Sequence, residues 1–276
     1  MEERVSSFVG MLREICAEEK IQLISFSGNW AHRLTKDGRT GYIVGYRFGL
    51  NSASVQEICR DKALTYLLLS DSGVPAVEHR FLELPNSLPE EGMAEYLEQC
   101  RSLLERDRQL VLKDNYGTGG NRVYLIRSMA EAEETLAKIR EFSYAAALSP
   151  FVRIDDEYRV VMLDGEPRLF IRKERAYRVE HGEIVYEEWR HNLGQGARGV
   201  VEADEMLKKR LGALAEKALL AVPARFASVD IVRTGEELSV LEINGGVMLE
   251  HFSSQDPQCR ALAMKVYREA VLKMLA

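Results

Sequence analysis

Three polar residues near the C-terminal end of the chain have the types and spacing of a metal site. Glu242 and Asn244 lie two positions apart in one apolar run, and Asp230 lies in the apolar run before it. Side chains of a strand alternate between its faces, so Glu242 and Asn244 would project to the same side. Two carboxylates and an amide oxygen form an oxygen-only ligand set, which suits Mg²⁺ held jointly with substrate phosphates. The same residues also fit an ordinary exposed strand face.

A second cluster combines a lysine with glycines. Lys113 ends an apolar run, and Gly117, Gly119 and Gly120 follow it closely. Glycines let a backbone approach a polyphosphate and offer amides to its oxygens, and a lysine adds a compact positive charge. The order differs from a Walker A loop, in which the lysine follows the glycines and a helix begins. A purely structural glycine-rich hairpin is the alternative interpretation.

Further polar residues complete an ordered series. Lys62 precedes the helix-ending signals Gly73 and Pro75, and Arg190 and Asn192 stand in a later polar segment that contains glycines. Each of these cations alone fits a solvated surface group. The informative feature is their order along the chain: a lysine, a lysine with glycines, an arginine with an asparagine, and then the acidic cluster.

Apolar periodicity predicts the helices that must position these groups. A capping box formed by Ser128 and Glu131 marks the start of one of them. Helices are expected over residues 3–19, 54–71, 128–142, 203–221 and 256–275.

The strands are expected mostly in antiparallel pairs, because Asp164–Gly165 and Thr234–Gly235 join apolar runs as hairpin turns do. Strands are expected within residues 21–27, 41–49, 75–84, 109–126, 145–152, 158–175, 179–189 and 226–246, and loops over 83–93 and 190–199. Antiparallel pairs with interspersed helices are typical of an α+β fold rather than a doubly wound parallel sheet.

The composition excludes several classes of protein. The chain has 276 residues, 46% of them hydrophobic, which is enough for a substantial core in one or two domains. A net charge of −6 is the opposite of what nonspecific binding to nucleic acid or acidic membranes requires, so neither partner is expected. The four cysteines lack zinc-like spacing, and no apolar run is long enough for a membrane span or a signal peptide. We expect a cytoplasmic protein.

The ordered series resembles the ATP-grasp superfamily, most closely its glutathione-synthetase-like ligases and the glutamate ligases of ribosomal-protein modification. The resemblance covers roughly residues 55–255. Its most specific part is LEINGGVMLE, which follows the family pattern of Glu, an apolar residue, Asn, two small residues and a later Leu-Glu. RHNLGQGA resembles the Arg-x-Asn-Leu glycine loop of the family, and VLKDNYGTGGNRV resembles its phosphate-covering hairpin.

The resemblance implies an α+β ATP-grasp fold in which two subdomains clamp ATP. Residues 1–55 would form a short N-terminal region that helps to select the substrate. Residues 56–152 would form the N-subdomain with the glycine-rich loop, and residues 153–276 the C-subdomain with the metal and catalytic residues. The chain departs from the family at Pro150, where the family has an acid, and in its short N-terminal region.

The resemblance also implies individual roles. Two Mg²⁺ ions, with Mn²⁺ as an alternative, would be held by Asp230, Glu242 and Asn244. Catalytic contacts with the acyl phosphate would come from Arg190, Asn192 and Arg159. ATP would contact Lys62, Lys113, Gly117, Gly119, Gly120, Pro150, Phe151, Val152 and one of Asp155, Asp156 and Glu157, with Asp155 carried forward as the ribose candidate.

The implied activity is an ATP-dependent carboxylate–amine ligase that works through an acyl phosphate. The partners would be a small-molecule or peptide carboxylate and an amine, and the chain could form a homo-oligomer. The alternatives are a small-molecule kinase on the same scaffold and a non-catalytic ATP-binding regulatory protein. His191 and His251 are candidate bases. The aromatic and arginine residues between Trp30 and Phe48 form either the core and rim of a small domain or a site for the substrate acid or the amine.

Overall fold

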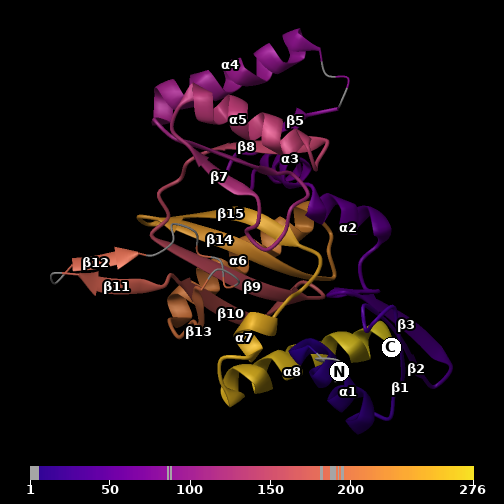
Figure 1. Ribbon diagram of the computed structural model, residues 1–276. Coiled ribbons are helices and arrows are strands. Elements are labelled where there is room, and N and C mark those ends of the chain that lie inside the picture. The colour runs from indigo at the N-terminus through magenta and orange to yellow at the C-terminus, as the bar shows by residue number, and fades with distance from the viewer. Residues whose placement is uncertain are drawn as a thin grey trace.

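The structure is a computed structural model that describes residues 6–85, 87, 89–180, 183–186, 191, 193 and 196–276. Figure 1 shows an upper lobe, a central sheet and a lower layer that contains both ends of the chain. Helices and antiparallel sheets alternate along the chain, which confirms the predicted α+β class.

The upper lobe is a four-stranded antiparallel sheet with two helices on one face. The strand order is β5-β8-β6-β7. Leu110 and Leu112 of β6 are fully buried under the helices, so alternation places Lys113 on the opposite face, toward the central sheet. The elements are β5 (Arg80–Glu83), α4 (Glu90–Asp107), β6 (Leu110–Asp114), β7 (Val123–Ile126), α5 (Met129–Arg140) and β8 (Ala145–Pro150).

The central sheet has two covered faces. Val160 and Met162 belong to a core with α2, α3 and α6, whereas Val161 and Leu163 belong to a core with the lower layer. The strand order is β13-β10-β9-β14-β15. The elements are α2 (Ala53–Arg60), α3 (Lys62–Asp71), β9 (Asp156–Leu163), β10 (Glu166–Glu174), β13 (Arg198–Val201), α6 (Glu205–Ala221), β14 (Phe226–Thr234) and β15 (Glu237–Asn244), and a separate pair is formed by β11 (Tyr177–Glu180) and β12 (Glu183–Tyr186).

The lower layer joins the two ends of the chain through an aromatic cluster. The ring centroid of Phe8 lies 5.0 Å from that of Tyr267, and the centroid of Phe48 lies 4.9 Å from that of Phe226 on the central sheet. This cluster seats the N-terminal sheet beside the sheet that carries Asp230. The elements are α1 (Ser7–Glu18), β1 (Gln22–Phe26), β2 (Ala31–Lys36), β3 (Arg39–Val44), β4 (Arg47–Phe48), α7 (Glu250–Ser253) and α8 (Pro257–Met274).

Some elements differ from the sequence-based expectation, and one of these differences bears on the site. The helix expected over 54–71 is divided at Asp61, whose side chain caps α3 by accepting from the backbone N–H of Leu64 at 2.9 Å. The break makes Lys62 the first residue of α3. Helix α4 and strand β2 were not predicted. Within the described ranges, no helix has the length and apolarity needed to cross a membrane.

Candidate functional site

A pocket lies between the upper lobe and the central sheet. It is bordered by β6, the glycine loop (residues 115–122), the segment that follows β8, and the ends of β9, β10 and β15. The lining consists of Lys62, Val77, Val111, Lys113, Asp114, Gly117, Thr118, Gly119, Gly120, Asn121, Val123, Ser149, Pro150, Phe151, Val152, Ile154, Glu157, Lys173, His191, Leu241 and Glu242.

Two lysines, Lys62 and Lys113, line this pocket, and no described carboxylate is in contact with either of them. Burial lowers the pKa of Lys62, and burial together with the charge of Lys62 lowers the pKa of Lys113 to about 8. The side chain of Lys113 makes no hydrogen bond or ion pair within the described part of the chain, although the residue is only 8% exposed. A buried cation without a partner is costly, so this wall of the pocket could hold an anion.

Lys62 also anchors the glycine loop. Its Nζ donates to the carbonyl oxygens of Asp114, Asn115 and Gly117 at 3.3, 3.1 and 2.6 Å. Gly120 has a φ of 69°, in the left-handed region that favours glycine. The loop is therefore held at its base, while its glycines give its backbone room to approach a ligand.

The carboxylate of Asp114 fixes the same loop from its other side. Its Oδ1 accepts from the backbone N–H of Tyr116 at 3.1 Å and from the hydroxyl of Ser143 at 2.9 Å. Its Oδ2 lies 3.4 Å from Nη1 of Arg122, which ends the loop. Asp114 thus bridges the two ends of the glycine loop.

The segment from Pro150 to Val152 lines the pocket, where the sequence placed it. It carries the chain from the upper lobe to the central sheet. Val111 and Leu241 line the pocket from these two different units. Apolar side chains beside exposed backbone suit a planar heteroaromatic ring that needs a few directional hydrogen bonds.

Of the three described acids after this segment, only Glu157 lines the pocket. Oδ2 of Asp155 accepts from the backbone N–H of Gly235 at 2.7 Å, and Asp156 forms an ion pair with Arg233. The ribose contact, for which Asp155 is the candidate, stays a prediction; one oxygen of this carboxylate is already bound to the turn between β14 and β15.

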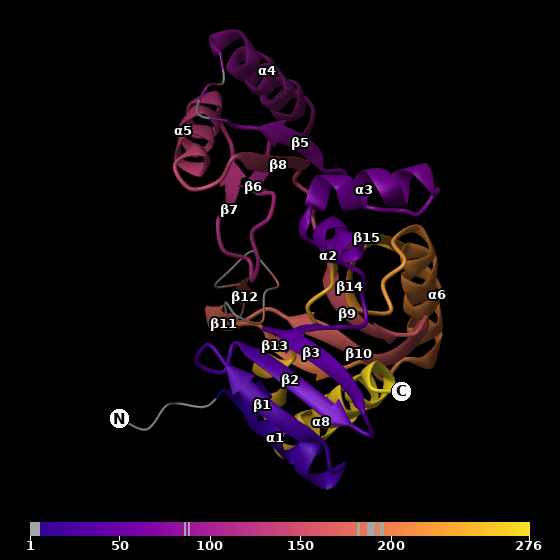
Figure 2. The same ribbon diagram turned by 90° about the vertical axis from the view of Figure 1, so that its right-hand side faces the viewer.

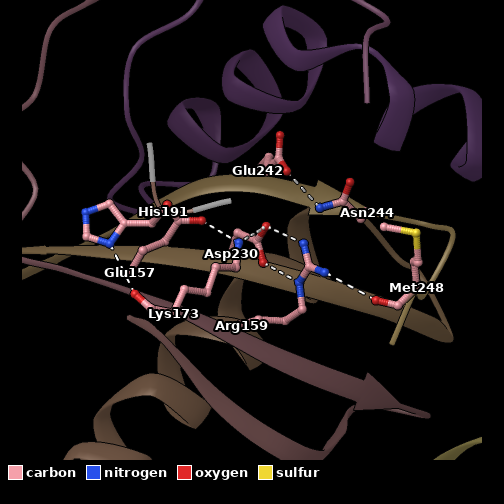
Figure 3. Close-up of polar contacts among 8 residues, drawn as sticks. All are labelled: Glu157, Arg159, Lys173, His191, Asp230, Glu242, Asn244 and Met248. Atoms are coloured by element: carbon pink, nitrogen blue, oxygen red, sulfur yellow. Dashed lines mark hydrogen bonds and ion pairs between the residues drawn. The ribbon is translucent and has the colours of Figure 1, made fainter. Parts of the chain in front are cut away.

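The floor of the site is a network of buried and fully paired charges (Figure 3). Arg159 donates to both oxygens of Asp230 at 2.8 Å, and Nζ of Lys173 donates to Oδ2 of Asp230 at 2.8 Å and to Glu157. Burial alone would raise the pKa of Asp230, but Arg159 and Lys173 outweigh burial and hold that pKa below its ordinary value. Arg159 also reaches the carbonyl of Met248 at 3.4 Å. The network ties β9, β10 and β14 to the loop after β15.

A β-bulge sets the register between the two acidic strands. Asp230 lies directly opposite Glu242, whereas the next pair is Ile231 with Val240, so Leu241 is the extra residue. Without the bulge, the register that begins at the turn would place Asp230 opposite Leu241. The bulge therefore brings Glu242 beside Asp230 and turns Leu241 into the pocket.

Glu242 and Asn244 fit a magnesium ion better than Asp230 does. Asn244 Nδ2 donates to Glu242 Oε1 at 3.0 Å, and the remaining oxygens of the two side chains have no hydrogen-bond partner among the described residues. Both oxygens of Asp230 already accept from cations. No cluster of three or more His, Cys, Asp or Glu residues in the described ranges would hold a metal by itself. An ion here would need oxygens from a bound phosphate, as Mg²⁺ usually does.

The comparison with known protein families decides the identity of this arrangement. A family model described as the RimK-like ATP-grasp domain matches residues 59–261. The chain belongs to this family. The predicted resemblance to ATP-grasp ligases is thereby confirmed, and the two lobes around the pocket are those of an ATP-grasp fold.

Individual relatives agree with the family assignment. The chain is 26% identical over 169 residues to the tetrahydromethanopterin:alpha-L-glutamate ligase of Methanocaldococcus jannaschii, covering 59% of this chain and 55% of the relative. It is 30% identical over 187 residues to the glutamate–LysW ligase ArgX of Sulfurisphaera tokodaii, covering 66% of this chain and 58% of the relative. The chain thus spans somewhat more than half the length of these curated relatives.

A solved structure shows the same fold. The D-alanine–D-alanine ligase from Bacillus anthracis, complexed with ATP, superimposes with a TM-score of 0.58 at 18% sequence identity. The match covers 79% of this chain and 66% of that ligase.

His191 adds one acceptor to the ATP-grasp pocket. Its Nδ1 lies 3.2 Å from the carbonyl of Lys173, so this nitrogen must carry the proton. Its buried Nε2 has no hydrogen-bond partner among the residues that the structure describes, and burial lowers the pKa of the imidazole. The neutral ring therefore presents a lone pair within the pocket lining.

The predicted catalytic residues have different outcomes. Arg159 is absent from the lining of this pocket and its guanidinium holds Asp230, so its contact with an acyl phosphate stays a prediction. Arg190 and Asn192 lie outside the described residues.

Lys173 is the one central cation of the site that sequence reasoning missed. A signal was present, because Leu169, Ile171 and Lys173 occupy alternate positions of β10 and the two aliphatic residues are buried. A lysine on the buried face of a strand requires a partner and thus marks a functional or structural charge network.

Proposed function

We propose that this chain is an ATP-dependent carboxylate–amine ligase. The observation that carries the proposal is the arrangement of charge across the pocket. Among the described residues, no carboxylate contacts Lys62 or Lys113 on one wall, and Glu242 and Asn244 present oxygens from the other side. A polyphosphate with its divalent cation satisfies both sides at once. The names of the two glutamate ligases support the formation of a carbon–nitrogen bond rather than another use of ATP.

The nucleotide would lie along the hinge between the two lobes. Backbone groups of Pro150 to Val152 would bind the adenine edge, with Val111 and Leu241 against the ring faces. The triphosphate would lie beneath the glycine loop, where Lys62 and Lys113 neutralise it.

Glu242 and Asn244 would hold the magnesium ions, with Asp230 completing the ligand set behind them. A bound Mg²⁺ supplies charge neutralisation at the phosphate oxygens. Arg159 and Lys173 keep Asp230 ionised and fixed. This preorganisation means that the carboxylates need not rearrange when the charge of the transferring phosphoryl group develops.

The reaction would proceed in two steps. A carboxylate oxygen of the substrate attacks the γ-phosphorus, the bond to the β–γ bridging oxygen breaks, and ADP leaves with an acyl phosphate formed. An amine then attacks the acyl carbon, the carbon–oxygen bond to phosphate breaks, and inorganic phosphate and one proton are released with the amide. Arg190 and Asn192 keep their predicted place at the acyl phosphate. The protein acts mainly by positioning and charge neutralisation.

An oxygen-label experiment tests this chemistry directly. Candidate amino acids and dipeptides are screened in pairs for ADP formation, and the productive acid is then prepared with ¹⁸O in its carboxylate. A ligase that uses an acyl phosphate transfers one labelled oxygen to inorganic phosphate, which mass spectrometry detects. If the labelled acid is consumed and the inorganic phosphate carries no label, the acyl-phosphate route is contradicted.

The other two activities give different outcomes in the same screen. A kinase would form ADP with a hydroxyl compound and no amine. A regulatory binder would show thermal stabilisation by Mg-ATP but no ADP with any pair.

A further inference from the structure

The N-terminal sheet has one face that no described element covers. Figure 2 shows β1, β2 and β3 in front of α1 and α8, with no described helix or strand drawn over them. His32, Leu34 and Ile43 point inward and are buried. The register places the opposite side chains in rows across the strands. We call these side chains the outer face: Ile24, Phe26, Arg33, Tyr42, Val44 and Arg47.

Four large apolar side chains are exposed on the outer face or beside it. Phe26, Tyr42 and Val44 are 45%, 56% and 43% exposed, and Trp30 at the adjoining turn is 56% exposed. The Trp30 ring is held against the Gly45 turn, because a Cβ added at Gly45 would lie 2.7 Å from it. A cluster of large apolar side chains held in the open on a rigid sheet is typical of a surface that binds another chain.

The charge of this region is opposite to that of the whole protein. Residues 21–56 contain four lysine or arginine residues and a single acidic residue, Asp37, whereas the chain carries −6 overall. The outer face itself carries two arginines and no carboxylate. The guanidinium of Arg33 lies 5.9 Å from the ring centroid of Phe26, and neither Arg33 nor Arg47 forms an ion pair within the described ranges. Two arginines among apolar side chains fit a partner with acidic and apolar groups.

The outer face is continuous with the candidate site. The Tyr46 carbonyl accepts from the backbone N–H of Val247, and the Tyr46 hydroxyl donates to Glu250. The side chain of Arg47 lies 3.4 Å from the Cβ position of Gly246, two residues beyond Asn244. A chain lying along the outer face would therefore reach the loop that follows the proposed magnesium ligands.

We propose that the outer face is a docking surface for an acidic polypeptide, which presents its reacting carboxylate or amine to the adjoining cleft. The role as a substrate rests on the proposed ligase activity; the docking does not. A nucleic acid is less well matched, because apolar side chains outnumber cations on the face and a polyanion would call for a broader basic surface. A second copy of this chain is less well matched. Two copies joined through their outer faces would bring arginines together, and neither face has a carboxylate to pair with them.

A peptide selection tests the docking surface without requiring turnover. Random dodecapeptides displayed on phage are selected on the immobilised full-length chain in the absence of nucleotide. We expect selected sequences enriched in Asp, Glu and aromatic or aliphatic residues. Fluorescence anisotropy then measures the Kd of a labelled selected peptide for Arg33→Glu and Tyr42→Ser. Each substitution should weaken binding by about tenfold or more.

Two matched control variants separate docking from general effects of charge and polarity. Arg127→Glu changes an exposed arginine in the upper lobe, and Leu220→Ser changes a leucine of α6 that is 83% exposed. Both should bind the peptide as the unmodified chain does, and thermal unfolding checks that all four variants fold.

The outcomes divide clearly. Selected peptides without acidic enrichment, or peptides whose Kd is unchanged in Arg33→Glu and Tyr42→Ser, would overturn the proposal. Tight binding of a mixed-sequence RNA oligonucleotide that is abolished by the same substitutions would also overturn the proposal. The same holds for a dimer that the substitutions convert to monomers while the peptide affinity stays unchanged. Acidic peptides that bind through the outer face support the docking surface whether or not the chain is a ligase. Failure of every acid and amine pair to yield ADP would contradict only the ligase assignment.

Discussion

The two sides of the pocket differ in how their buried charged side chains are paired. On the upper side, Lys113 is buried without any contacting anion. On the floor, Asp230 is buried but accepts from Arg159 and Lys173, and each cation has a carboxylate partner. Burial of an unpaired charge destabilises the fold, whereas a satisfied network can be stable and rigid. The upper side could therefore accommodate a ligand that supplies an anion, whereas the paired charges of the floor hold its side chains in place.

Removing one charge from the floor should have the largest effect on stability. Asp230→Asn leaves Arg159 and Lys173 buried with too little negative charge, and should lower the free energy of unfolding by about 3–5 kcal/mol. Urea unfolding followed by circular dichroism measures the change.

The matched control is Asp156→Asn, which breaks the partly exposed ion pair with Arg233 and should cost about 1 kcal/mol or less. Equal effects of the two substitutions would mean that the floor network contributes no more than a surface pair.

Glu242→Gln should affect activity rather than stability. Loss of one preorganised electrostatic contact should reduce the rate of ADP formation by roughly 100-fold, about 3 kcal/mol of transition-state stabilisation. Steady-state assays with the productive acid and amine measure this loss. Glu237→Gln, at the exposed start of the same strand, is the control and should leave the rate unchanged. Undiminished turnover in Glu242→Gln would remove this residue from the metal site.

Replacement of Lys113 should change the stability of the free protein and its affinity for nucleotide in opposite directions. Lys113→Met removes an unpaired buried charge while keeping the apolar stem, so the melting temperature without ligand should stay equal or rise. The affinity for Mg-ATP should fall by about tenfold or more, because a charge-assisted contact is lost. Thermal scans and isothermal titration calorimetry measure the two effects. A lowered melting temperature without ligand would show that Lys113 has a structural partner.

The smallest expected effect is a pH dependence of nucleotide affinity. The pKa of Lys113 is lowered to about 8, so the lysine loses its charge as the pH rises through this value. The affinity for Mg-ATP should fall gradually above pH 8, by no more than the loss expected for Lys113→Met. Without ligand the sign reverses: because the folded-state pKa lies below the ordinary value of 10.5, the stability contribution of this group should increase between pH 8 and 10.5. Calorimetry across this range checks both, and Lys113→Met should lack the dependence.

Local patterns were enough to predict most of the helices and strands around the site. The hairpin of β9 and β10, the Ser128 cap of α5 and the strand that carries Glu242 and Asn244 all follow from alternation and turn chemistry, which act over a few residues. The same local patterns could not reveal the break at Asp61 or the helix α4. The sequence signals for helix and for loop are both weak at these positions, and tertiary packing decides between the two structures.

Alternation, turn pairs and the order of cations and carboxylates along the chain established the α+β class and the ligase-like series of residues, because these signals are local and survive without packing. Three-dimensional packing alone decided how these groups are used. The bulge at Leu241 set the register of Asp230 with Glu242, and Lys173 entered the site from a strand distant in sequence. Register and charge pairing between strands depend on contacts between segments that lie far apart in the chain, and no short stretch of residues encodes them.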